Sequence, residues 1–126
     1  MQNKPHSEVM SIYRDADIAI DQVLAGWYGG FAVEMMAMGK PVMCWIREED
    51  LDFVPKLLRK ELPILNVRPD NLVEDIGHVL SLKSRWKDWS KMSRDYVLKW
   101  HNPAKVASAL IKLYEGKSTV FDLEFV

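Results

Sequence analysis

The sequence predicts an α/β fold in which a parallel sheet is flanked by helices. Three short apolar runs, residues 18–20, 41–46 and 64–67, have the length and composition of strands buried on both faces. Helical patterns separate these runs, and strands that alternate with helices form parallel sheets. A complete doubly wound domain usually has about five or six strands, so three strands predict only half of such a sheet, extended by C-terminal helices.

In the first half of the chain, a helix precedes the first strand and another follows it. Ser7 is the expected N-cap of the first helix, which ends near residues 14–16. After the first strand comes a glycine-containing turn, residues 25–30. The next segment, residues 31–38, is rich in helix formers and is closed by Gly39 at a C-cap position, directly before the second strand.

The second half of the chain is predicted to be mainly helical. An acidic loop is expected at residues 47–52 and a helix over residues 53–60, before the third strand. A helix begins near Pro69, since proline is favoured in the first turn. Further helices are expected at residues 83–100 and 104–114. The first of these carries an aromatic stripe, expected to pack in the core, of Trp86, Trp89, Tyr96 and Trp100.

The composition is that of a soluble globular domain. The chain has 126 residues, 48% of them hydrophobic and 28% charged, and its net charge of -1 gives no general attraction for nucleic acid. No apolar run approaches the roughly 20 residues of a membrane-spanning helix, and the N-terminus lacks the apolar core of a signal peptide. We therefore expect a cytoplasmic protein. Its one cysteine, Cys44, lies in the second apolar run, where a buried and unreactive thiol is expected.

No metal or other cofactor is expected. The three histidines, His6, His78 and His101, are far apart and lack the spacing of metal ligands. Basic residues outnumber acidic ones between residues 83 and 105. A solvated helix face is the simplest interpretation of that series, and a weak peripheral contact with an anionic membrane is compatible with it.

Residues 18–46 contain the clearest sign of a binding site. In an open parallel sheet, ligands bind beyond the carboxyl ends of the strands, where loops meet helix N-termini. Gly29 and Gly30 lie where the second helix begins, so a phosphate can approach the backbone closely and meet N–H groups that have no partner within the helix. Glu34, about one turn further along, has a carboxylate that can accept hydrogen bonds from sugar hydroxyls.

The segment from Gly26 to Val42, GWYGGFAVEMMAMGKPV, together with Asp15–Ile18, resembles the donor-site block of retaining glycosyltransferases. These are the group 1 enzymes of the GT-B class, which have two Rossmann-like domains. The resemblance covers about Pro5 to Gly116. It implies that residues 1–116 are part of the C-terminal, nucleotide-sugar-binding domain of such an enzyme, and that residues 117–126 are a C-terminal tail.

The resemblance also implies roles for individual residues. Glu34 matches the glutamate that binds the ribose hydroxyls of the donor nucleotide, and Gly29 matches the glycine whose backbone approaches the diphosphate and the donor sugar. Gly30, Phe31 and Ala32 match the positions whose backbone amides lie at the start of the helix.

One position departs from the family pattern. The family's first glutamate, which contacts the donor sugar, falls on Gly26. Either Trp27 and Tyr28 reshape the loop so that another group takes this role, or the sugar is held differently. Asp21 or Gln22 is a candidate to approach the site instead. Gly26 and Asp21 are therefore added to the candidate site.

The resulting expectation is a half-site for a nucleotide diphosphate-sugar, whose sugar is transferred to an acceptor held by an N-terminal Rossmann-like domain that this chain lacks. The isolated chain is then not expected to turn over nucleotide sugars. The alternative is a non-catalytic interaction subunit, or a degenerate glycosyltransferase-like domain. In either case an open sheet edge predicts a dimer or exchanged segments.

Overall fold

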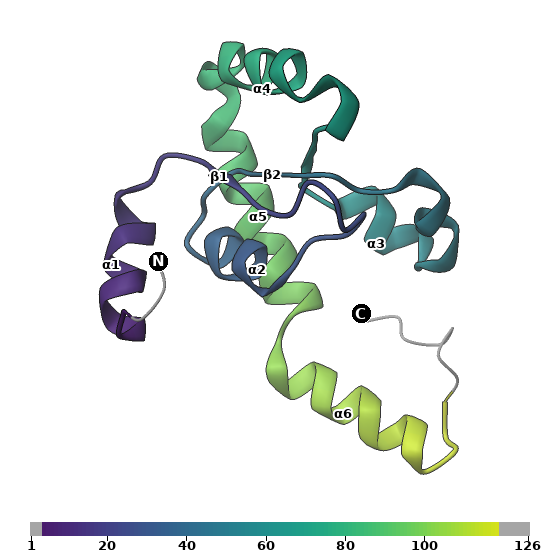
Figure 1. The fold of residues 1–126 in the computed structure, drawn as a ribbon. Helices are drawn as coiled ribbons and strands as arrows, with labels where there is room; N and C mark the ends of the chain where they lie inside the picture. Colours follow the sequence, from purple (N-terminus) through teal and green to yellow (C-terminus); the bar gives the residue numbers. More distant parts are fainter. Residues whose placement is uncertain (1–3, 119–126) are drawn as a thin grey trace.

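The computed structural model describes residues 4–118 and has a mixed α/β architecture with a three-stranded parallel sheet (Figure 1). The strands are β1 (Ala19–Ile20), β2 (Val42–Cys44) and β3 (Leu65–Asn66), and β2 lies between the other two. The predicted α/β class and the parallel pairing of all three runs are confirmed. Each strand is shorter than its apolar run, and β1 and β3 form the edges of the sheet.

Helices cover both faces of the sheet. In Figure 1, α4 lies on one side of the strands and α2 on the other, while α5 runs past both. Short 3-10 turns precede α3, α4 and α5. The helices are α1 (His6–Asp15), α2 (Gly30–Ala37), α3 (Lys56–Glu61), α4 (Leu72–Ser81), α5 (Trp86–Trp100) and α6 (Pro103–Tyr114).

The alternation of side chains along β2 divides the core into two clusters. Successive strand residues point to opposite faces of a sheet. Val42 packs in a cluster with residues of α2 and the C-terminal half of α5, including Tyr96, whereas Met43 packs in a second cluster with Val79 of α4. Trp89, near the start of α5, lies against the second cluster. The predicted aromatic stripe is thus a packing surface, and it serves both faces.

Three predicted boundaries were wrong. Ser7 lies inside α1, because the N-cap is Pro5 and the helix starts at His6. The Pro5 carbonyl accepts hydrogen bonds from the N–H groups of Glu8 and Val9. The expected acidic loop is a 3-10 helix, Glu48–Phe53, in which acidic residues occupy the first turn. The helix expected over 53–60 begins only at Lys56, because Pro55 and the residue before it are extended.

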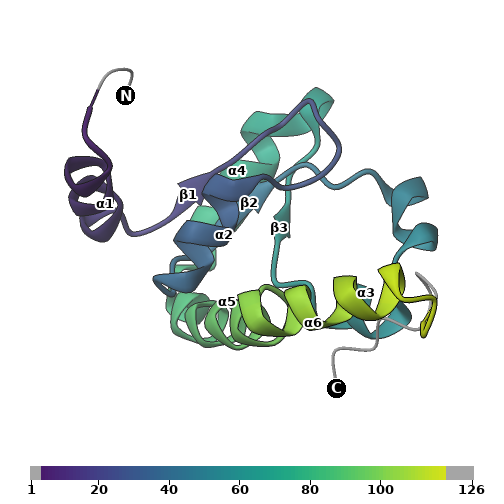
Figure 2. The ribbon, with the colours of Figure 1, turned by 90° about the horizontal axis from the view of Figure 1, so that it is seen from below.

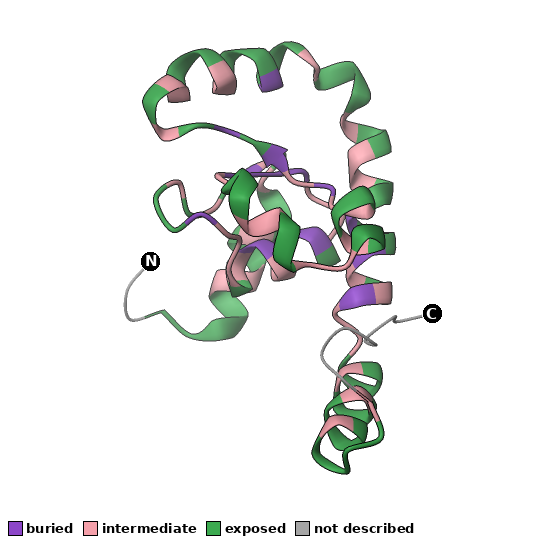
Figure 3. Cartoon of the chain, turned by 90° about the vertical axis from the view of Figure 1, so that its right-hand side faces the viewer, coloured by how far each residue is buried: buried purple, intermediate pink, exposed green. Residues whose placement is uncertain are grey.

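The two outer helices contribute little to the core. Neither α1 nor α6 has a buried residue, and Figure 3 shows α6 projecting from the body with exposed and intermediate positions only. α1 stands apart on the β1 side of the molecule (Figure 2), where Tyr13 contacts Phe31 of α2 with ring centroids 5.0 Å apart. Between residues 4 and 118, no helix is both long and apolar enough to cross a membrane.

Candidate anion-binding site

The carboxyl ends of β1 and β2 meet at one edge of the sheet. Backbone pairing continues past the strands: the Trp45 N–H donates to the carbonyl of Gln22 (3.2 Å), and the Arg47 N–H donates to that of Gly26 (2.8 Å). The loop after β1 therefore lies beside the segment after β2. This loop leads directly into α2, so the helix begins at the edge where parallel sheets bind ligands.

The start of α2 has the geometry that the glycine pair predicts. Gly29 is the N-cap and Gly30 the first helical residue, and the first helical hydrogen bond runs from the Val33 N–H to the Gly29 carbonyl (3.3 Å). The N–H groups of Gly30, Phe31 and Ala32 therefore precede the repeating helical bonds. Gly30 is exposed, and a Cβ added to it meets no atom within 4 Å. The helix thus presents open backbone at this point.

Phe31 and Ala32 contribute to this site through their backbone only. The side chain of Ala32 is fully buried against the sheet, and the ring of Phe31 is half-buried. Their side chains anchor the first turn of α2 in the core, so the amide groups at its start are held in place by packing.

Asp21 directly follows β1, and its carboxylate lies at the start of α2. Its Oδ2 accepts a hydrogen bond from the Gly29 N–H at 2.7 Å. A side chain at position 29 would not fit without movement, because its Cβ would lie 2.5 Å from the Gln22 side-chain amide. The protein thus supplies a carboxylate of its own to the Gly29 amide, and it leaves the next three amides of the turn to other partners.

Glu34 is a half-buried carboxylate without a partner. It lies in the middle of α2, one turn after the glycines, and its side chain forms no hydrogen bond or ion pair among residues 4–118. A half-buried charged group usually has a partner, since burial removes water from it. The unpaired carboxylate is therefore available to a ligand.

The side chain of Arg47 packs against Gly26. The sequence pattern did not reveal this contact. Gly26 is buried, with φ +82°, and a Cβ there would lie 3.2 Å from the guanidinium of Arg47. That guanidinium also lies 5.5 Å from the centre of the Trp45 ring and 3.5 Å from Asp50. A positive charge thus stands beside the position where the resemblance expects a carboxylate. Arg47 directly follows an apolar run, and that placement is the sequence signal that could have identified it.

The loop before α2 is also held from the other side, by Tyr28. Its hydroxyl lies 2.8 Å from the Tyr96 hydroxyl and 3.0 Å from Nε2 of His101. Its ring meets both partner rings edge to face, and it stacks on Trp27 at 5.2 Å. Burial raises the pKa of both tyrosines and lowers the pKa of His101. All three groups are therefore neutral near pH 7.

Cys44, at the end of β2, is not a nucleophile at neutral pH. It is fully buried, as predicted, and its thiol donates to the Gln22 carbonyl at 3.1 Å. Burial and, to a smaller extent, the charge of Asp21 raise its pKa to about 12. The thiol therefore stays protonated.

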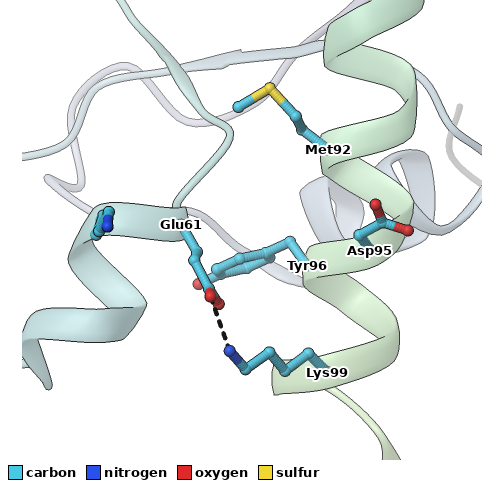
Figure 4. A pocket seen from close by; sticks show the side chains of 6 residues that line it. Glu61, Met92, Asp95, Tyr96 and Lys99 are labelled. Carbon is cyan, nitrogen blue, oxygen red and sulfur yellow. Dashed lines mark hydrogen bonds and ion pairs between the residues drawn. The ribbon is translucent and has the colours of Figure 1, made fainter.

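A pocket of about 340 Å³ lies between the end of α3 and α5 (Figure 4). Glu61 crosses it and accepts hydrogen bonds from Lys99 Nζ and from the indole N–H of Trp100, both at 2.8 Å. None of the predicted site residues lines it. Its lining residues are Lys60, Glu61, Met92, Asp95, Tyr96 and Lys99. Although four of its six lining residues are charged, the surface that the pocket offers a ligand is mainly apolar.

Across the described residues, no three His, Cys, Asp or Glu side chains gather in a way that could hold a metal ion. Comparisons with protein-family models, with curated proteins and with solved structures found no match for this chain.

Proposed function

We propose that the edge formed by Asp21, Gly26 and the start of α2 binds a nucleotide diphosphate-sugar, and that this chain is the donor-binding half of a glycosyltransferase built on a Rossmann-like half-domain. The observation that carries the proposal is Glu34. It is an unpaired, half-buried carboxylate one turn beyond a glycine pair, at the carboxyl edge of a parallel sheet. In this proposal, Glu34 accepts hydrogen bonds from the ribose hydroxyls.

The diphosphate approaches α2 on the side of Gly30. The amides of Gly30, Phe31 and Ala32 donate to its oxygens, and the helix dipole adds about 0.3–1 kcal/mol for an anion, or up to about 2 kcal/mol where the site is partly buried. Asp21 already accepts from the Gly29 N–H, and its charge repels the phosphates. The guanidinium of Arg47, which lies against Gly26, is the positive charge at the same edge, and it is shared with Asp50 at 3.5 Å.

The catalytic part of the proposal is positioning and charge stabilisation. The departing diphosphate carries the charge that develops in glycosyl transfer, and amides fixed by packing stabilise it without having to reorganise. The acceptor is held by a separate Rossmann-like domain.

The test uses two glycines that both have open space where a side chain would stand. In the Gly30→Ala variant, a methyl group lies where the diphosphate approaches, while no protein atom lies within 4 Å of it. Gly77→Ala, in the middle of α4, makes the same change on another helix. We expect Gly30→Ala to weaken UDP or GDP binding at least about tenfold in calorimetric titration, which corresponds to about 1.4 kcal/mol. Gly77→Ala should bind both nucleotides as tightly as the wild type does. Equal affinities for both variants would refute the proposal.

A second candidate function is a non-catalytic interaction subunit. Asp21 caps the Gly29 amide with the protein's own charge, which favours a helix start that needs no ligand. Moreover, each strand is followed by one almost fully exposed apolar side chain: Leu24 (78%), Phe53 (82%) and Val73 (86%). If no nucleoside diphosphate or nucleotide sugar binds the wild-type chain, this second function is the better one.

A further inference from the structure

The network of Tyr28, Tyr96 and His101 joins the turn before α2 to the far end of α5. Tyr28 directly precedes Gly29, whereas its partners lie 68 and 73 residues further along the chain. Tyr96 is 2% exposed and belongs to the core cluster of α2 and α5. The turn that presents the α2 amides is therefore attached through one hydroxyl to a rigid part of the molecule.

The number of protons in the network decides the direction of its hydrogen bonds. The Tyr96 hydroxyl has one hydrogen-bonding partner within residues 4–118, the Tyr28 hydroxyl. If His101 is neutral with its proton on Nδ1, Tyr96 donates to Tyr28 and Tyr28 donates to Nε2, so both hydroxyl protons are used. A protonated His101 must donate instead. The two contacts then have three donor protons between them, so one of the two hydroxyl protons loses its acceptor within the network.

We infer that Tyr28, Tyr96 and His101 are positioning residues for the start of α2: the relay from Tyr96 through Tyr28 to neutral His101 holds the Gly29–Gly30 turn, and protonation of His101 releases it. The relay itself rests only on the contacts described, and its effect on a ligand rests on the proposed function. It acts through the backbone, so none of the three side chains needs to touch the ligand.

The charged groups around the network do not oppose the lowering of the His101 pKa. Glu61 of α3 raises the pKa of Tyr96 by less than burial does, and it pairs with Lys99 of α5 at 2.8 Å. On the loop side, the carboxylate of Asp21 accepts from the N–H of Gly29, the residue after Tyr28. Burial alone lowers the pKa of His101 below its ordinary value of 6.5. Because the folded pKa is depressed, the relay is intact above the ordinary value and is lost as the pH falls through the folded one.

The experiment follows the backbone amides of Gly29 and Gly30 by NMR in the whole 126-residue chain, from about pH 8 to about pH 5, the window in which histidine titrates. Both amide signals are expected to move with the same midpoint as the His101 ring, below 6.5. In His101→Gln, the pH-dependent shift of the two glycine amide signals should disappear. His78→Gln, an exposed histidine on α4, leaves it unchanged.

Tyr28→Phe separates the relay from a simple effect of charge. This variant keeps the ring contacts and the titration of His101 but breaks the hydroxyl link, so the glycine signals should no longer follow the histidine. Glycine signals that still titrate in Tyr28→Phe, or that stay fixed in the wild type while His101 titrates, would overturn the inference.

A second readout uses inorganic pyrophosphate as the probe. Tyr28→Phe removes both hydroxyl contacts and is expected to weaken pyrophosphate binding about two- to tenfold at pH 7.5. A Tyr28→Phe variant that binds pyrophosphate as tightly as the wild type counts against positioning. If the wild type binds no pyrophosphate and no UDP, the proposed function fails, and the NMR titration still decides whether the relay exists.

Discussion

Replacing Glu34 by alanine separates a binding carboxylate from a structural one. The Glu34 side chain has no hydrogen bond or ion pair within residues 4–118, so its removal leaves no protein group without a partner. Alanine is slightly the better helix former, and an acidic group about five residues into a helix gains little from the dipole. We therefore expect the free energy of unfolding to change by less than about 0.5 kcal/mol, the range of ordinary surface substitutions.

The effect on ligand binding should be much larger. A charged acceptor that is fully engaged by ribose hydroxyls contributes about 1.5–3 kcal/mol. This corresponds to a loss of roughly 10- to 150-fold in affinity for a nucleoside diphosphate. Inorganic pyrophosphate lacks the ribose, so its affinity should not fall. The Glu34→Ala variant is thus expected to bind nucleoside diphosphates more weakly than the wild type does, and to bind pyrophosphate equally well.

Calorimetric titration with UDP, GDP and pyrophosphate, paired with thermal melting curves, measures both quantities. Glu74→Ala is the matched control, because it removes an exposed carboxylate from α4 and changes the net charge equally. Unchanged nucleoside diphosphate affinity in Glu34→Ala would refute the ribose role. A fall in melting temperature by several degrees would show that Glu34 stabilises the fold, against the reasoning from its missing partner.

Two further substitutions test neighbouring parts of the same edge. Asp21→Asn keeps an oxygen for the Gly29 N–H but removes the charge, so nucleoside diphosphate affinity should rise about 1.5- to fivefold at low salt, the size of one partly exposed charge interaction; a fall in affinity would instead mean that Asp21 binds the donor. Asn66→Ala removes a pair of hydrogen bonds, of 2.8 and 3.3 Å, to the backbone of Ile46. Because that backbone is buried, the expected loss is about 1–3 kcal/mol of unfolding free energy in denaturant titrations, with Asn66→Asp losing less; an unchanged midpoint would contradict this.

The sequence by itself determined the class of the fold and the place of the candidate site. Buried parallel strands and helices have local signatures, since an apolar run, a glycine pair or a capping asparagine acts within a few residues of itself. Asn102 illustrates this: its Oδ1 accepts from the N–H groups of Ala104 and Lys105 and so starts α6 between the helices predicted at residues 83–100 and 104–114. The glycine pair likewise begins α2 at the predicted position.

Local signals were less informative about boundaries. The extended conformation of Pro55 shortened the predicted third helix, and acidic residues after β2 formed a 3-10 turn where a loop was expected. In both cases the pattern predicted the kind of segment approximately, while the start of the hydrogen-bonded turns depended on how the chain leaves the sheet.

Only the tertiary structure decided what surrounds the start of α2. The capping of Gly29 by Asp21, the guanidinium of Arg47 over Gly26 and the hydroxyl contact between Tyr28 and His101 each join residues that no periodicity relates. Their positions depend on the register of β1 against β2 and on the packing of α5 against α2. A side chain's partner across 73 residues is set by the packing of whole elements, and local sequence does not encode that packing residue by residue.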